Sequence, residues 1–274
     1  MRRLAVAAVL LVMTAVASAC GGGGGSTTAG GGSTSSTAIA TTVPVPTTVA
    51  APTGPSTDLT LRIADVRLVN SEEADNGMRV LLPAGVATAS VTISGLPSPN
   101  QVISVCQAND LDSRLIGAAC RTPANGDAVT VNLGAAASGV EIIQVGGSGT
   151  GPAANSIALD AVTIRYAASS RRVNARLSQI SAGEHPGFTL TPASTDGSYR
   201  ATLGWTVIQV FGGTASNGQI QVLQAGVAAN QAQGGAAGVQ LDGKLPTPVG
   251  DVAIRVQNIG DAAMVAPKLS LLLP

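Results

Sequence analysis

The stretch LTLRIADVRL, residues 59–68, indicates the fold class. Leucine or isoleucine occupies every second position at its start, which is the pattern of a strand with one buried face. Valine and leucine alternate with other residues at its end, but in the opposite phase. One extra residue near Ala64–Asp65 accounts for the change of phase, so we expect a long strand with a β-bulge there.

The same alternation recurs in short segments along the rest of the chain. Turn sequences such as GLPSPNQ (95–101) and TPANGDA (122–128) separate these segments. Strands with this spacing are typical of antiparallel sandwiches. The segments fall into two sets of similar length without a convincing residue-level repeat. We therefore expect an all-β protein with two tandem antiparallel β-sandwich domains, jelly-roll or Ig-like, over residues 58–169 and 170–274.

The composition excludes one class of partner. Charged residues make up 11% of the 274 residues and the formal net charge is zero, whereas about 25% is usual for a globular protein. The chain has no basic cluster that would form a nucleic-acid surface. We expect no nucleic-acid partner.

The first twenty residues carry the features of a secretion signal. Two arginines precede an apolar run that is too short to span a bilayer, and Ala17-Ser18-Ala19 then precedes Cys20. This order resembles the lipobox of bacterial lipoproteins, in which the cysteine carries a diacylglycerol after cleavage. The resemblance implies a signal peptide over 1–19 and lipid attachment at Cys20. The lipobox usually has leucine where Ala17 stands, and the same residues fit an A-x-A cleavage site that would release the protein.

The segment 20–57 contains no charged residue and is rich in Gly, Ser, Thr and Pro. Such a composition is typical of a disordered tether. A tether suits an acyl anchor, because it holds a folded part away from the membrane, and two acyl chains anchor stably. We expect an extracytoplasmic protein, lipid-anchored to the cell membrane and exposed to the cell wall or the exterior.

The cysteines predict a disulfide. If Cys20 is acylated, Cys106 and Cys120 remain as an even pair outside the cytoplasm, where disulfides persist. Metal binding needs more ligands than two cysteines, and His185, the single histidine, is far away in sequence.

Several acidic residues are candidates for calcium binding. The loop NSEEADNG (70–77) contains Glu72, Glu73 and Asp75, and hard cations take their oxygen ligands from such loops. The phrase ALDAVTIRY, which contains Asp160, resembles the closing strand of jelly-roll carbohydrate-binding modules, where an acidic residue holds a structural calcium. A solvated acidic loop explains the same residues, so we expect no cofactor, with structural calcium as the alternative.

Catalytic motifs are scarce. A Ser-His-Asp triad would need His185, and the sequence lacks G-x-S-x-G. A glycosidase can work with two carboxylates, but its cleft usually holds aromatic side chains, which are few here. We expect no enzyme. A glycan-directed hydrolase or its accessory carbohydrate-binding domain is one alternative, and a purely structural surface protein is another.

The candidate binding residues cluster near the start of the second set of strands. Tyr199 and Trp205 share one face of their strand, so they form either core or an exposed platform for a sugar or a peptide. The candidate contact arginines are Arg171, Arg172, Arg176 and Arg200. We expect a non-catalytic binding or cell-envelope interaction module whose partner is an envelope polysaccharide or a protein.

Overall fold

The computed structural model describes residues 55–69, 77–96, 102–112, 120–134, 138–145, 156–206, 216–235, 238–246 and 252–274. In this part of the chain the regular elements are all strands, as the alternation predicts. They are β1 (Thr57–Val69), β2 (Gly77–Leu81), β3 (Thr88–Ser94), β4 (Val102–Ala108), β5 (Ala128–Asn132), β6 (Gly139–Val145), β7 (Ser156–Ala168), β8 (Arg172–Arg176), β9 (Gln179–Ile180), β10 (Gly187–Thr191), β11 (Ser198–Thr206), β12 (Gly218–Gln224), β13 (Val227–Gly234), β14 (Val239–Lys244), β15 (Val252–Asn258) and β16 (Met264–Leu272).

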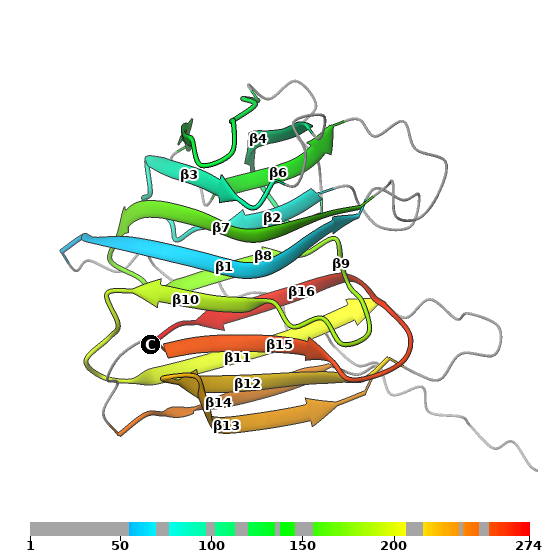
Figure 1. Ribbon diagram of the computed structural model, residues 1–274. Coiled ribbons are helices and arrows are strands. Elements are labelled where there is room, and N and C mark those ends of the chain that lie inside the picture. The colour runs from blue at the N-terminus through cyan, green and yellow to red at the C-terminus, as the bar shows by residue number, and fades with distance from the viewer. Residues whose placement is uncertain are drawn as a thin grey trace, which may run out of the picture. The chain divides into compact units, whose positions relative to one another are not determined.

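The strands form two antiparallel sheets (Figure 1). Sheet 1 has the order β13-β12-β15-β10-β1-β7-β3-β5. Sheet 2 has the order β14-β11-β16-β8-β2-β6-β4, and β9 also pairs with β16. The all-β sandwich that the sequence predicts is therefore confirmed.

The two halves of the chain have the same topology. In the first half, four strands pair in the order β1-β7-β3-β5. In the second half, the order β8-β16-β11-β14 is equivalent: each begins with the first strand of its half, which pairs with the last strand. Likewise β2-β6-β4 corresponds to β10-β15-β12, to which β13 adds one strand. This is the strand order of a jelly roll, complete in the second half. We call β1–β7 repeat 1 and β8–β16 repeat 2.

The repeats join edge to edge, with their sheets exchanged. In sheet 1, β1 of repeat 1 pairs with β10 of repeat 2, and in sheet 2, β2 pairs with β8. The two repeats are therefore related by a pseudo-twofold axis. Each of the two contacts joins the first strand of one repeat to the second strand of the other. The expected boundary near residue 170 lies where the repeats meet, but both sheets continue across it.

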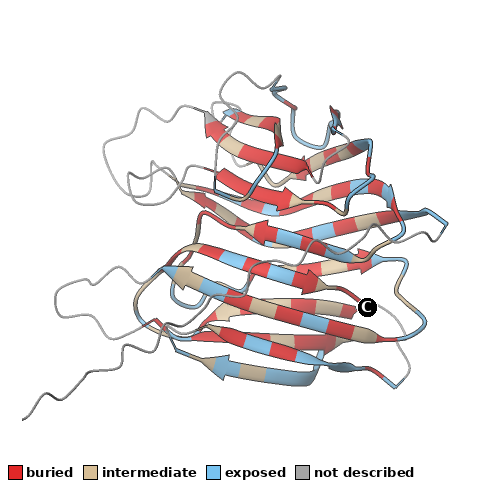
Figure 2. Cartoon of the chain, turned by 180° about the vertical axis from the view of Figure 1, so that it is seen from behind, coloured by how far each residue is buried: buried red, intermediate tan, exposed pale blue. Residues whose placement is uncertain are grey.

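Buried and more exposed residues alternate along most strands (Figure 2). The buried side chains form the core between the two sheets. On β1 the buried residues change from odd to even positions after Ile63, and Asp65 has a φ of 55°. The expected change of phase is thereby confirmed. The register between β1 and β7 is constant across it and β7 changes phase at the same place, so neither strand has the extra residue of the expected β-bulge. In repeat 2 the strand that corresponds to β1 is interrupted at the equivalent place. Its two parts, β8 and β9, both pair with β16.

A disulfide joins Cys106 and Cys120, as predicted. It lies at the edge of β4, whose counterpart in repeat 2 is β12. Where β12 pairs with the whole of β13, β4 makes an isolated bridge between Val105 and Arg121. The disulfide thus holds a segment at the edge where repeat 2 has a full strand.

Candidate functional site

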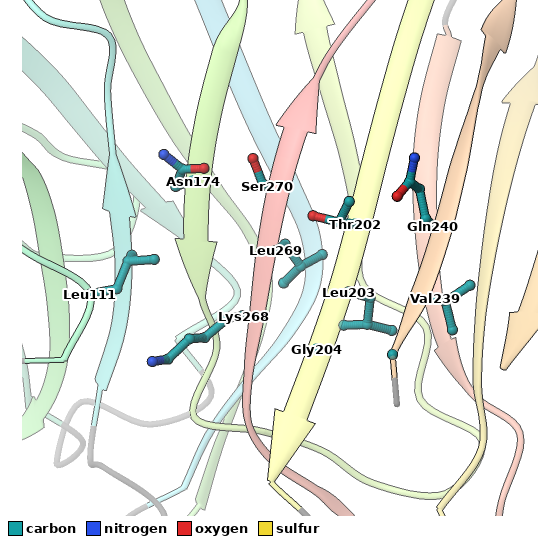
Figure 3. Close-up of a pocket in the computed structure, with 11 residues that line it drawn as sticks. Leu111, Asn174, Thr202, Leu203, Gly204, Val239, Gln240, Lys268, Leu269 and Ser270 are labelled. Carbon is teal, nitrogen blue, oxygen red and sulfur yellow. The ribbon is translucent and has the colours of Figure 1, made fainter. Parts of the chain in front are cut away.

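Four polar side chains form a row across the outer face of sheet 2 in repeat 2 (Figure 3). Asn174 of β8 lies opposite Ser270 of β16, Ser270 lies opposite Thr202 of β11, and Thr202 lies opposite Gln240 of β14. Successive residues of a strand point to opposite faces, and the sequence neighbours of these four residues are buried in the core. We call these four residues the polar row.

The polar row lies in a groove of about 510 Å³, the second-repeat groove. Leu111, from the segment after β4, lines the groove together with Lys268. Lys268 Nζ lies 2.8 Å from Asp112 Oδ2, so this segment of repeat 1 contacts repeat 2. Gly204 also lines the groove, and a Cβ placed there would meet no atom within 4 Å, which leaves open space beside the row.

The chemistry of the polar row suits a ligand with many hydroxyl groups. Its two amides and two hydroxyls donate and accept hydrogen bonds, and none is charged at neutral pH. Neighbouring strands are about 4.8 Å apart, so the row spans about 14 Å. Within the described part of the chain, Lys268 is the one ionisable residue that lines the groove.

Three of the four predicted arginines border this groove. Arg172 and Arg200 lie in the adjacent row, on either side of Leu272, and Arg200 forms a 3.3 Å ion pair with Asp242. Arg176 lies opposite Lys268 on the other side of the polar row. The structure thus places Arg172, Arg176 and Arg200 beside one groove, whereas the sequence shows only that they lie within one short part of the chain.

Arg171 has a different role. Its guanidinium donates hydrogen bonds to backbone carbonyls of Leu273 at 3.0 Å and Pro274 at 2.8 Å, which fixes the end of the chain. Burial lowers the pKa of Arg171 below its usual value, and the nearby Tyr166 and Asp196 oppose this effect. We therefore remove Arg171 from the candidate contacts.

The two predicted aromatic residues belong to the interior. Tyr199 is buried and its hydroxyl accepts a 2.7 Å hydrogen bond from Asn230 Nδ2. Trp205 packs against the core, and its indole N–H donates to Ser216 Oγ at 2.7 Å. Their side chains therefore pack in or against the core and do not form an exposed platform. Neither Tyr199 nor Trp205 lines the second-repeat groove.

The histidine lies elsewhere, in the loop before β10 and near Asp65 of β1. His185 Nδ1 is 3.9 Å from Asp65 Oδ2, in a hollow that Asp160 also lines. Within the described residues no group of three or more His, Cys, Asp or Glu is placed to hold a metal ion. The calcium candidates Glu72, Glu73 and Asp75, and the lipidation candidate Cys20, lie outside the described residues.

Sequence reasoning missed the whole polar row. Its members come from four strands that are far apart in the chain and form no motif. Comparison with protein families, curated proteins and solved structures found no match for this chain. No helix among the described residues is long and apolar enough to cross a membrane.

Proposed function

We propose that this protein is a lipid-anchored extracytoplasmic binding module that holds an envelope polysaccharide in the second-repeat groove. The observation that carries this proposal is the polar row, four hydrogen-bonding side chains in register on an outer sheet face. The N-terminal sequence supports the anchor, since Cys20 follows a signal-like segment and precedes an uncharged stretch up to residue 57.

The borders of the groove favour an acidic polysaccharide. Four cations, Lys268, Arg172, Arg176 and Arg200, lie around the polar row. Lys268 forms an ion pair with Asp112, and Arg200 forms one with Asp242. Guanidinium groups recognise carboxylates through paired hydrogen bonds. A chain with hydroxyl groups along its length and uronate carboxylates at intervals matches both features.

The groove favours binding over catalysis. Glycoside hydrolysis commonly uses two carboxyl groups beside the bond that is cleaved. Among the described residues, those that line the groove include no Asp, Glu or His. Release of reducing ends from a uronate oligosaccharide by the wild-type protein would contradict this part of the proposal.

A carboxylate in the middle of the polar row should repel an acidic ligand. We expect Ser270→Glu to weaken binding of a uronate-containing hexasaccharide in the second-repeat groove by about tenfold or more, because like charges in contact are costly. Ser270 is exposed, so the fold should tolerate the change. Isothermal titration calorimetry measures the affinity, with a neutral hexasaccharide of the same linkage as the second probe.

The matched control is Gln257→Glu on β15, which adds the same charge to sheet 1, away from the groove. It should bind the uronate probe as the wild type does. A Ser270→Glu variant that matches the wild type in both affinity and stoichiometry would overturn the assignment of this groove.

The anchor is tested at Cys20. We expect Cys20→Ala to abolish incorporation of a radioactive fatty acid and to move the protein from the membrane fraction to the medium. Labelling is the decisive measurement, because the A-x-A cleavage site survives the substitution. A wild-type protein that takes up no label would contradict the anchor and would favour simple secretion.

A further inference from the structure

Repeat 1 carries a second row of polar side chains on the outer face of sheet 1. Thr60 of β1 lies opposite Arg165 of β7, Arg165 lies opposite Ser90 of β3, and Ser90 lies opposite Thr130 of β5. These residues line a groove of about 430 Å³, the first-repeat groove. Arg165 and Thr130 are exposed, and Thr60 and Ser90 are half-buried.

The two rows occupy equivalent positions in the two repeats. The strand orders β1-β7-β3-β5 and β8-β16-β11-β14 correspond. The break after Ile63 in β1 corresponds to the break after Leu177, where β8 gives way to β9. Counting from these breaks, Thr60 stands where repeat 2 has Asn174, and Arg165 stands where it has Ser270.

The equivalence is not a consequence of core packing. The members of both rows point away from the core, whereas their sequence neighbours are buried. Polar residues are usual at outward positions of an antiparallel sheet, so what distinguishes the two rows is their equivalent register and the grooves that they line. Hydrogen-bonding side chains occupy all four positions in each repeat.

Two charged residues line the first-repeat groove, Arg165 within the row and Asp58 two residues before Thr60 on β1. Arg165 lies between the hydroxyls of Thr60 and Ser90, and within the described residues it has no hydrogen-bond or ion-pair partner. Arg62 lies in the adjacent row, as Arg176 does in repeat 2. A free guanidinium flanked by hydroxyls matches a carboxylate on a hydroxylated chain.

We infer that the first-repeat groove is a second site for the same class of ligand, an acidic polysaccharide. This inference rests on the proposed function of the second-repeat groove. The two rows lie on the outer faces of different sheets, so they face away from each other. One molecule therefore binds two separate chains and cross-links them, and a long polysaccharide gains avidity from many such molecules.

The test uses the full chain and the uronate-containing hexasaccharide. Titration calorimetry of the wild type should give about two oligosaccharides per protein, and Arg165→Glu and Ser270→Glu should each give about one. The double variant should bind none. The matched control is Arg255→Glu on β15, which reverses a charge outside both grooves and should leave the stoichiometry at about two.

A second measurement follows cross-linking directly. The wild type should raise the light scattering of a long uronate polysaccharide, and each single variant should fail to do so, because one site cannot bridge two chains. If Arg165→Glu lowers the melting temperature, Thr130→Glu at the end of the same row provides an independent variant.

The outcomes separate this inference from the proposed function. One site per chain, lost in Ser270→Glu and unchanged in Arg165→Glu, overturns the second site and supports the first. One site lost only in Arg165→Glu supports the first-repeat groove and overturns the assignment of the second-repeat groove. Absence of binding by the wild type overturns both.

Discussion

Replacing Glu141 with glutamine should lower the free energy of unfolding by about 3–5 kcal/mol. Glu141 is 1% exposed and Arg79 is fully buried. The carboxylate Oε1 lies 2.9 Å from Arg79 Nε and 2.8 Å from Nη2. Glutamine has the same shape, so the change removes the charge without opening a cavity and takes from the buried Arg79 cation the counter-charge that Glu141 provides.

The position of this ion pair explains the size of the effect. Arg79 and Glu141 lie opposite each other on β2 and β6, and Arg176 of repeat 2 lies on the other side of Arg79. Arg79 Nη1 also donates a 2.9 Å hydrogen bond to the Leu111 carbonyl, from the segment that follows β4. The pair thus connects both repeats and the segment at the edge of the groove.

Denaturant unfolding at neutral pH measures the effect. The control is Asp242→Asn, which removes the acid of the exposed Arg200–Asp242 pair and should cost no more than about 1 kcal/mol. The combined change Arg79→Met and Glu141→Leu should recover much of the lost stability, because it removes both buried charges. Equal losses from Glu141→Gln and Asp242→Asn would contradict the importance of burial.

The local parts of the fold were predictable from the sequence because they depend on near neighbours. Alternation identifies a strand and its buried face, and the change of phase after Ile63 identifies the irregular backbone at Asp65, which has a positive φ. The disulfide followed from counting: once Cys20 is set aside, two cysteines remain. Each of these inferences needs only the composition or a window of a few residues.

The partners of the strands were not predictable in the same way. Alternation gives the face of a residue but not which strand lies beside it, so neither the pairing of β1 with β10 nor the polar row could be derived. Arg79 is the clearest example. Its alternation places it on the outer face of β2, where a solvated arginine is expected, yet it is fully buried and hydrogen-bonded to the carbonyl of Leu111.

The arginines show the same limit at the site. Arg171 and Arg172 are neighbours in sequence, but Arg171 precedes β8 and binds the chain terminus while Arg172 lies on β8 beside the second-repeat groove. Cross-strand register decided which arginines meet. The repeat could not be detected in the sequence because equivalent positions hold different residues. Arg165 and Ser270, for example, are both polar and both point away from the core, but they are not the same residue.

Reduction of the Cys106–Cys120 disulfide should lower the free energy of unfolding by about 3 kcal/mol in the chain-entropy model, since the bridge closes a loop of roughly 15 residues. The bridge sits next to Val105, whose backbone N–H and carbonyl both bond to Arg121. Among the described residues of repeat 1, the Val105–Arg121 bridge lies at the edge that β13 covers in repeat 2, so the disulfide reinforces a short backbone pairing.

Denaturant unfolding with and without a thiol reductant measures this effect, and the Cys106→Ala/Cys120→Ala variant is the control, because a reductant should not change its midpoint. Because both sheets continue from repeat 1 into repeat 2, we expect one transition that shifts as a whole, with no repeat 2 left folded alone. Alkylation of Cys106 and Cys120 in denatured, unreduced protein would contradict the disulfide. Two separate transitions after reduction would instead show that the β1–β10 and β2–β8 contacts do not couple the repeats.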